Sequence, residues 1–172
     1  AAAKNIAGSL IHGGKNNDLA TIGARFDIST TNVFGGLGMD YINVSAGRDI
    51  LGGVIKGGSN TDTTSDLADE ITVNSGENIS GAFIAGNGGA DTIDATTTLF
   101  NDTTLKGGTS DDLLGVNASM VTGAQIYGGV ASWKTSFTPA TAQLLLSEWS
   151  APCTLLNPTT FASKIAIVQK HT

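Results

Sequence analysis

The chain has 172 residues, of which 40% are hydrophobic, 6% aromatic and 14% charged, and its net charge is −6. This acidic balance argues against binding to nucleic acid or to an anionic membrane surface, because both need Lys and Arg. No apolar run reaches the ~20 residues that a transmembrane helix needs. A single cysteine, Cys153, leaves no partner for a disulfide within the chain.

The composition changes near residue 130. All 23 glycines lie between Gly8 and Gly129, whereas the three prolines and both tryptophans lie after them. Residues 1–129 carry 6 Lys or Arg against 14 Asp or Glu, and residues 130–172 carry 3 against 1. We therefore predict two parts, a repetitive acidic body of residues 1–129 and a distinct C-terminal segment of residues 130–172 with the opposite charge.

Glycine-led pairs recur through the acidic body at nearly equal intervals of 22, 22, 29, 21 and 21 residues. The pairs begin at Gly13, Gly35, Gly57, Gly86, Gly107 and Gly128. The long interval contains a polar insertion of about residues 63–69, which is typical of a surface loop. A fixed period of this length predicts a stack of similar units.

Each repeat also has a regular apolar pattern. An apolar residue shortly precedes each pair: Ile11, Val33, Ile55, Ile84, Leu105 and Ile126. Short stretches that alternate between apolar and polar residues follow the pairs, and this period of two predicts strands. The density of Gly, Asn, Asp and Thr disfavours helices. We therefore predict an all-β fold, a parallel β-solenoid (β-roll or β-helix) of about five to six coils, with these apolar residues in one inward column.

Five of the pairs are followed, five residues after the first glycine, by an aspartate: Asp18, Asp40, Asp62, Asp91 and Asp112. Stacked coils lie ~4.8 Å apart, so these carboxylates should form one column. Their mutual repulsion favours a bound cation. Calcium prefers carboxylate and carbonyl oxygens, and glycine allows both the sharp turn and the approach of carbonyl oxygens.

These repeats resemble the calcium-binding nonapeptide of RTX (repeats-in-toxin) proteins, G-G-x-G-x-D-x-(apolar)-x. Residues 35–43 fit every position, residues 86–94 lack the second glycine, and residues 107–115 have Ser at the fourth position. Residues 13–21 and 57–65 have Asn there. The resemblance implies calcium as the cofactor and the following metal ligands: Asp18, Asp40, Asp62, Asp91, Asp112, Gly14, Gly36, Gly38, Gly58, Gly89 and Gly108.

The chain departs from this family in its coil length. The family's β-roll has two nonapeptides in each coil of about 18 residues, whereas this chain has one motif in 21 or 22 residues. We therefore expect one calcium-binding edge and one plain edge, or a β-helix related to the RTX roll. The alternative is that the glycines are only turn residues and that no metal binds.

The C-terminal segment has the signals of a helix. Thr138 and Pro139 are a suitable cap and first residue for a helix over residues 140–149. The segment either caps the open end of the solenoid or docks onto a partner, with Trp133 and Trp149 as anchors.

No motif of a nucleophile elbow, a zinc protease or a phosphate loop occurs, and His12 and His171 are isolated, so we do not expect an enzyme. RTX-type repeats occur in bacterial surface-layer proteins, secreted adhesins, toxins and enzymes, and related solenoids occur in phage appendages. The resemblance therefore implies an extracellular, cell-surface or virion location. We expect a non-catalytic structural module that joins copies of itself, or a larger surface or virion assembly, through residues 130–172, without nucleic acid or a transmembrane segment. The alternative is the calcium-folded repeat module of a secreted enzyme, toxin or adhesin, including the ice-binding type.

Overall fold

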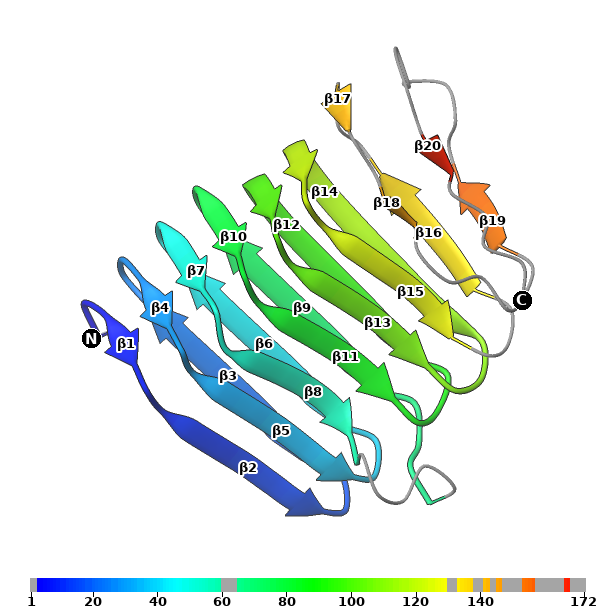
Figure 1. The fold of residues 1–172 in the computed structure, drawn as a ribbon. Coiled ribbons are helices and arrows are strands. Elements are labelled where there is room, and N and C mark those ends of the chain that lie inside the picture. Colours follow the sequence, from blue (N-terminus) through cyan, green and yellow to red (C-terminus); the bar gives the residue numbers. More distant parts are fainter. Residues whose placement is uncertain are drawn as a thin grey trace.

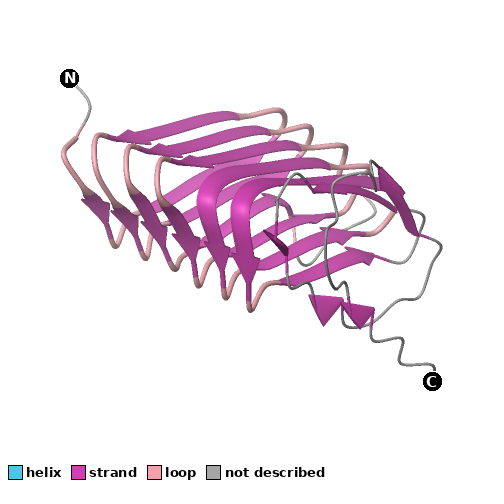
Figure 2. Ribbon diagram, turned by 90° about the horizontal axis from the view of Figure 1, so that it is seen from above, coloured by secondary structure: helices cyan, strands magenta, loops and turns pink. Residues whose placement is uncertain are grey.

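The protein is a parallel β-solenoid of about five turns in the computed structural model (Figure 1). The structure describes residues 3–59 and 65–129, and then the strand segments 133–137, 141–142, 145–146, 153–156 and 166–167. Side chains are described as far as residue 128. Figure 2 shows that successive coils stack in one file, with their turns aligned. The predicted fold class is therefore confirmed.

Each coil contributes three strand segments, and the equivalent segments of successive coils pair side by side in rows. The first row contains β2 (Leu10–Lys15), β5 (Asn32–Leu37), β8 (Val54–Gly58), β11 (Phe83–Asn87), β13 (Thr104–Gly108) and β15 (Gln125–Gly129). The second row begins with β3 (Leu19–Ala24), β6 (Tyr41–Ala46) and β9 (Glu70–Ser75). The third row begins with β1 (Ile6–Ala7), β4 (Ile28–Ser29), β7 (Asp49–Leu51) and β10 (Asn78–Ser80).

Two long strands join the second and third rows. β12 (Thr92–Asn101) pairs with β9 through its first half and with β10 through its second half. β14 (Asp112–Thr122) pairs with β12 along most of its length. A coil of three segments explains why the repeat is longer than two nonapeptides, because the third row adds residues that a two-stranded roll lacks.

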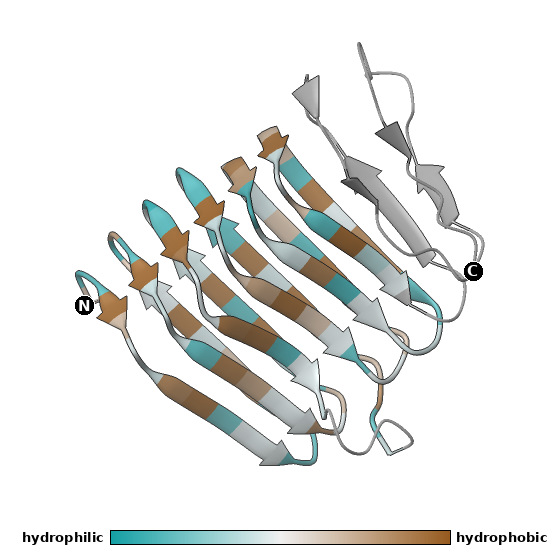
Figure 3. Cartoon of the chain, in the orientation of Figure 1, coloured by the Kyte–Doolittle hydropathy of each residue, from teal (hydrophilic) through white to brown (hydrophobic). Residues whose placement is uncertain are grey.

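The core is built from columns of apolar side chains, one residue from each coil. Ile11, Val33, Ile55, Ile84, Leu105 and Ile126 stand in register in the first row, as predicted. All of them except Ile11, in the first coil, are buried. Figure 3 shows the hydrophobic bands at matching positions on neighbouring strands. Each buried Ile or Leu stabilises the fold by about 1.5–3 kcal/mol, and β-branched side chains suit the extended backbone.

Parallel pairing continues beyond the change of composition at residue 130. β16 (Trp133–Phe137) pairs with β14, and β19 (Cys153–Leu156) pairs with β16. β17 (Thr141–Ala142) pairs with β14, β18 (Leu145–Leu146) pairs with β15, and β20 (Ala166–Ile167) pairs with β18.

The helix predicted over residues 140–149 is wrong, because both segments described inside that range, β17 and β18, are strands. The open edges of β14 and β15 offer backbone partners, and this pairing outweighs a capping signal worth about 1 kcal/mol. None of the described residues belongs to a helix long and apolar enough to span a membrane.

Candidate metal site

A ladder of five aspartates runs through the turn between the first and second rows: Asp18, Asp40, Asp69, Asp91 and Asp112. Each stands just before, or at the start of, a second-row strand, and one oxygen of its side chain is buried in the turn. Asp40 and Asp91 are only 2% and 1% exposed. We call these five residues the aspartate ladder.

Backbone hydrogen bonds hold the ladder together. The Oδ1 atom of each later aspartate accepts the backbone N–H of the aspartate in the coil before it. The N–O distances along the ladder are 2.8, 2.7, 2.8 and 3.0 Å. One carboxylate oxygen per coil therefore ties neighbouring coils together, which requires a short acidic side chain or its amide at this position.

The third place in the ladder belongs to Asp69. The spacing from Gly57 predicts Asp62 there, but Asp62 lies outside the described residues and Asp69 makes the bonds to both neighbours, Asp40 and Asp91. The inserted residues separate the glycine pair from its aspartate. In this coil the ladder aspartate is therefore identified as the residue just before the strand β9, and not by its distance from Gly57.

The first glycine of each pair makes room for the aspartate. A Cβ atom on Gly35 would collide with the Oδ2 atom of Asp40 and with the carbonyl oxygen of Gly57. The equivalent Cβ on Gly86 or on Gly107 would collide with Oδ2 of the aspartate in its own coil. None of these first glycines has a positive φ, so the sequence requires glycine here for space and not for backbone conformation.

The second and fourth motif positions need glycine for a different reason. At the second position Gly14, Gly36 and Gly108 have φ of 115°, 121° and 134°. At the fourth position Gly38 and Gly89 have φ of 128° and 96°. L-residues rarely adopt these values. Asn16, Asn87 and Ser110 replace glycine at equivalent positions with φ of 71°, 83° and 81°, close to the left-handed region that Asn tolerates.

The structure brings every predicted glycine ligand into this turn. Cβ atoms on Gly36, Gly38, Gly89 and Gly108 would each collide with a backbone carbonyl group of the preceding coil. Gly58 also stands in the turn, beside the carboxylate of Asp66. The glycines therefore allow the turns to stack with their backbones in contact.

Asp66 is a buried residue of the turn that the repeat pattern does not identify. Its Oδ2 atom accepts the backbone N–H of Ser59 at 2.8 Å, and the residue is 6% exposed. A Cβ atom on Gly58 would occupy the place of this carboxylate. Asp66 thus fastens the end of the insertion to the strand β8. The acidic composition of the insertion was the available sequence signal for Asp66, but no residue at an equivalent position in the other repeats supports it.

The second carboxylate oxygen of every ladder residue is buried without a hydrogen-bond partner: Oδ2 of Asp18, Asp40, Asp69, Asp91 and Asp112. Burial without compensation favours the neutral acid. It raises the pKa of Asp69 and of Asp112 to about 7 and the pKa of Asp91 to about 8, against backbone hydrogen bonds that lower them. Burial also raises the pKa of Asp40 and of Asp66.

These atoms fit a hard cation. A carboxylate oxygen of Asp18 and the carbonyl oxygen of Gly35 converge on the space that a side chain at Gly13 would fill, and Asp112 and Gly128 do the same beside Gly107. The donors are all oxygen, as calcium prefers. Within the described residues no three His, Cys, Asp or Glu side chains form a metal-binding group. An ion on the ladder would therefore need backbone carbonyl oxygens as well as the carboxylates.

No protein-family model, curated protein or solved structure matches this chain.

Proposed function

We propose that this chain is a non-catalytic structural module whose stacked coils are stabilised by calcium. We place it outside the cell, at a cell surface or on a virion, where it forms part of a larger assembly. The observation that carries the proposal is the row of buried Oδ2 atoms without hydrogen-bond partners. The resemblance of the repeats to the RTX nonapeptide supports the choice of calcium and of an extracellular location.

The ladder carboxylates need a positive partner at neutral pH. A buried ionised carboxylate without a partner is strongly unfavourable, so it takes up either a proton or a cation. With pKa values of about 7 to 8 for Asp69, Asp91 and Asp112, a proton is only partly bound at pH ~7.5. Calcium at the millimolar levels typical of extracellular modules would replace it.

The repetition of the site supports a structural role. A buried Oδ2 atom without a partner recurs in each ladder aspartate, and from Asp40 onward the Oδ1 atom already bonds to the preceding coil. A cation shared between coils would join them along the whole stack. Metal binding would then contribute directly to folding, because the unfolded chain has no preformed site.

We keep residues 130–172 as the predicted contact with copies of the chain or with a larger surface or virion assembly. Two features of the sequence support this. The segment has a net positive charge whereas residues 1–129 are acidic, and it contains Trp133 and Trp149, the residue type most enriched at interface anchors.

The decisive test compares Asp91→Asn with Asp94→Asn. The amide introduced by Asp91→Asn would keep an oxygen acceptor for the N–H of Asp69 but replace the partnerless oxygen with a nitrogen. Asp94 is the matched control, because it is exposed and lies outside the ladder. Thermal unfolding at pH ~7.5 is measured for each protein, with calcium and with chelator. The metal content of the purified parent is measured as well.

We expect calcium to raise the melting temperature of the parent and of Asp94→Asn by at least about 3 °C, which is about 1 kcal/mol for a chain of this size. Asp91→Asn should respond less to calcium, and in chelator it should be more stable than the parent because a buried charge is gone. If calcium and chelator give the parent the same melting curve, the ladder binds protons only and the proposal is wrong.

A further inference from the structure

The two broad outer faces of the solenoid carry charges of opposite sign. On the first-row face, the residues flanking the inward column are outward positions. Ala85, between the two lysines, is buried. None of these positions is acidic, and Lys56 and Lys106 are basic: Leu10, His12, Asn32, Phe34, Val54, Lys56, Phe83, Ala85, Thr104, Lys106, Gln125 and Tyr127. This face is therefore basic on a chain whose net charge is −6.

The second-row face has the opposite character. From β3 to the first part of β14, its outward positions contain the exposed acids Glu70 and Asp94 and no Lys or Arg: Leu19, Thr21, Gly23, Tyr41, Asn43, Ser45, Glu70, Thr72, Asn74, Thr92, Asp94, Thr96, Leu113, Gly115 and Asn117. The corner that leads into the third row differs from both faces, because it mixes charges, as in the pair of Arg48 with Asp27.

Each face also presents apolar surface. On the first-row face, the Nζ atom of Lys56 lies 6.0 Å from the ring centroid of Phe34 and 5.4 Å from that of Phe83, and Leu10 is 70% exposed. On the second-row face, Leu19 is 74% and Tyr41 is 38% exposed. Aromatic and aliphatic side chains beside a few charges are the composition of a protein–protein contact.

We propose that the first-row face of one copy packs against the second-row face of the next copy, with Lys56 and Lys106 opposite Glu70 and Asp94. This inference rests on the assembly role proposed above and names the surface that carries it. The occupant is a second copy because the same molecule presents both complementary surfaces.

The charged residues of the two faces lie on neighbouring coils, although the two lysines are farther apart than the two acids. Lys56 and Lys106 stand in one outward column two coils apart, through the register of β8, β11 and β13, which is roughly 10 Å at the usual strand spacing. Glu70 and Asp94 lie on adjacent coils, β9 and β12. Lysine side chains are long enough to reach both acids when the coils of two copies run parallel.

Such a contact joins two different surfaces, so each copy keeps one free face and the contact continues from copy to copy unless the rotation between copies closes a ring. It would extend the assembly sideways, whereas the predicted contact through residues 130–172 would extend it at the end of the solenoid. Two contacts in different directions are what a surface layer needs.

The test uses two charge-reversed versions of the full chain. Lys56→Glu with Lys106→Glu makes both faces acidic, and Glu70→Lys with Asp94→Lys makes both faces basic. Sedimentation velocity measures the association of the parent, of each variant and of their equal mixture in calcium. Ionic strengths of ~10 mM and ~150 mM are compared, where the Debye length is about 30 Å and about 8 Å.

We expect the parent to associate, and to associate more weakly at the higher ionic strength. Each variant alone should associate at least about tenfold more weakly, because attraction becomes repulsion at both pairs. The equal mixture should regain the association of the parent, since an all-acidic copy meets an all-basic one.

Three results would overturn the inference: a parent that stays monomeric at low ionic strength, variants that associate like the parent, or a mixture that stays monomeric. A monomeric parent that binds polygalacturonate through Lys56 and Lys106 would overturn it in favour of an acidic polysaccharide. Calcium-dependent melting is recorded for every sample. A normal calcium response beside unchanged association removes only this inference, whereas a missing calcium response removes the proposed function.

Discussion

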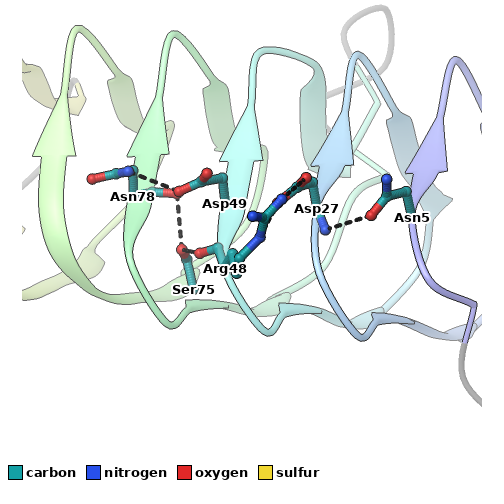
Figure 4. Close-up of polar contacts among 6 residues, drawn as sticks. All are labelled: Asn5, Asp27, Arg48, Asp49, Ser75 and Asn78. Carbon is teal, nitrogen blue, oxygen red and sulfur yellow. Dashed lines mark hydrogen bonds and ion pairs between the residues drawn. The ribbon is translucent and has the colours of Figure 1, made fainter.

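Aspartates occur at two places in the coils, and the two sets are satisfied in different ways. At the corner between the second and third rows, the Oδ1 and Oδ2 atoms of Asp27 lie 3.1 and 2.5 Å from Nε and Nη2 of Arg48 (Figure 4). On the next coils, Oδ1 of Asp49 accepts a hydrogen bond from Nδ2 of Asn78 at 2.7 Å. In the turn at the other end of the second row, the ladder aspartates have backbone partners for Oδ1 from Asp40 onward and none for Oδ2.

The corner aspartates therefore find their hydrogen-bond partners within the protein, whereas each ladder aspartate keeps one oxygen without a partner. The Ser75 hydroxyl lies within hydrogen-bonding distance of the carbonyl oxygens of Arg48 and Asn78, and the Asp27 N–H donates to Asn5, so side chains close this corner from coil to coil (Figure 4). The difference teaches that repetition of a residue type does not define its role. An aspartate carboxylate is a surface ion-pair partner at the corner, whereas the aspartate carboxylates of the ladder are candidate cation ligands.

The largest expected effect tests the space reserved for the ladder. Gly35→Ala would place a methyl group against Oδ2 of Asp40 and the Gly57 carbonyl oxygen, whereas Gly23→Ala meets nothing within 4 Å and needs no unusual φ. We expect Gly35→Ala to lower the free energy of unfolding by about 3 kcal/mol and Gly23→Ala to leave it nearly unchanged. Urea unfolding measures both. Equal effects would mean that the turn opens freely, contrary to the packing described.

A smaller effect concerns pH. In chelator, the raised pKa values of Asp69, Asp91 and Asp112 mean that the folded state binds more protons than the unfolded state between about pH 4 and about pH 8. The free energy of unfolding should therefore fall as pH rises through this window, because the stabilisation from the protonated carboxyl groups of the folded state is lost as they ionise. With calcium present the sign should reverse, because protons displace the cation as pH falls. Denaturant unfolding across this range measures both slopes, and two parallel slopes would contradict cation binding at the ladder.

The smallest effect belongs to the corner. Arg48→Ala removes an exposed ion pair with Asp27 and a cation–π contact in which the guanidinium lies 5.3 Å from the Phe26 ring centroid. We expect the melting temperature to fall by about 1 °C at low ionic strength and by less in high salt, with no change in the response to calcium. Arg48→Lys, which keeps the charge without the two-pronged geometry, should lie in between. A loss as large as that of Gly35→Ala would show that the corner matters as much as the ladder.

The repeat predicted much of this arrangement. The glycine intervals and the apolar residue before each pair predicted the inward column from Ile11 to Ile126, because a constant period leaves few ways to bury one side chain per coil. The same spacing predicted four of the five ladder residues: Asp18, Asp40, Asp91 and Asp112. It did not predict Asp69, because an insertion interrupts the count between Gly57 and the next strand.

The role of each glycine was not evident from the pattern. Gly35 and Gly36 are adjacent and identical in sequence, yet the first leaves room for a side chain and the second provides a φ of 121°. Likewise, the repeat spacing marks Asp91 as a ladder position, but it does not say that Asp91 is buried whereas Asp94, three residues later, is exposed. The alternation of the strand, combined with the side on which the core lies, decides between them.

The sequence by itself determined the period, the β-strand character of the glycine-rich repeats and the acidic character of the chain, because these depend on local preferences repeated along it. Only the tertiary structure decided which carboxylates share a buried turn, how many strands complete a coil, and that residues after 130 continue the pairing at β16 and β18. The physical reason is that each of these features depends on the neighbouring coil. An unpaired strand edge and a buried carboxylate oxygen acquire their partners only when another coil is stacked beside them.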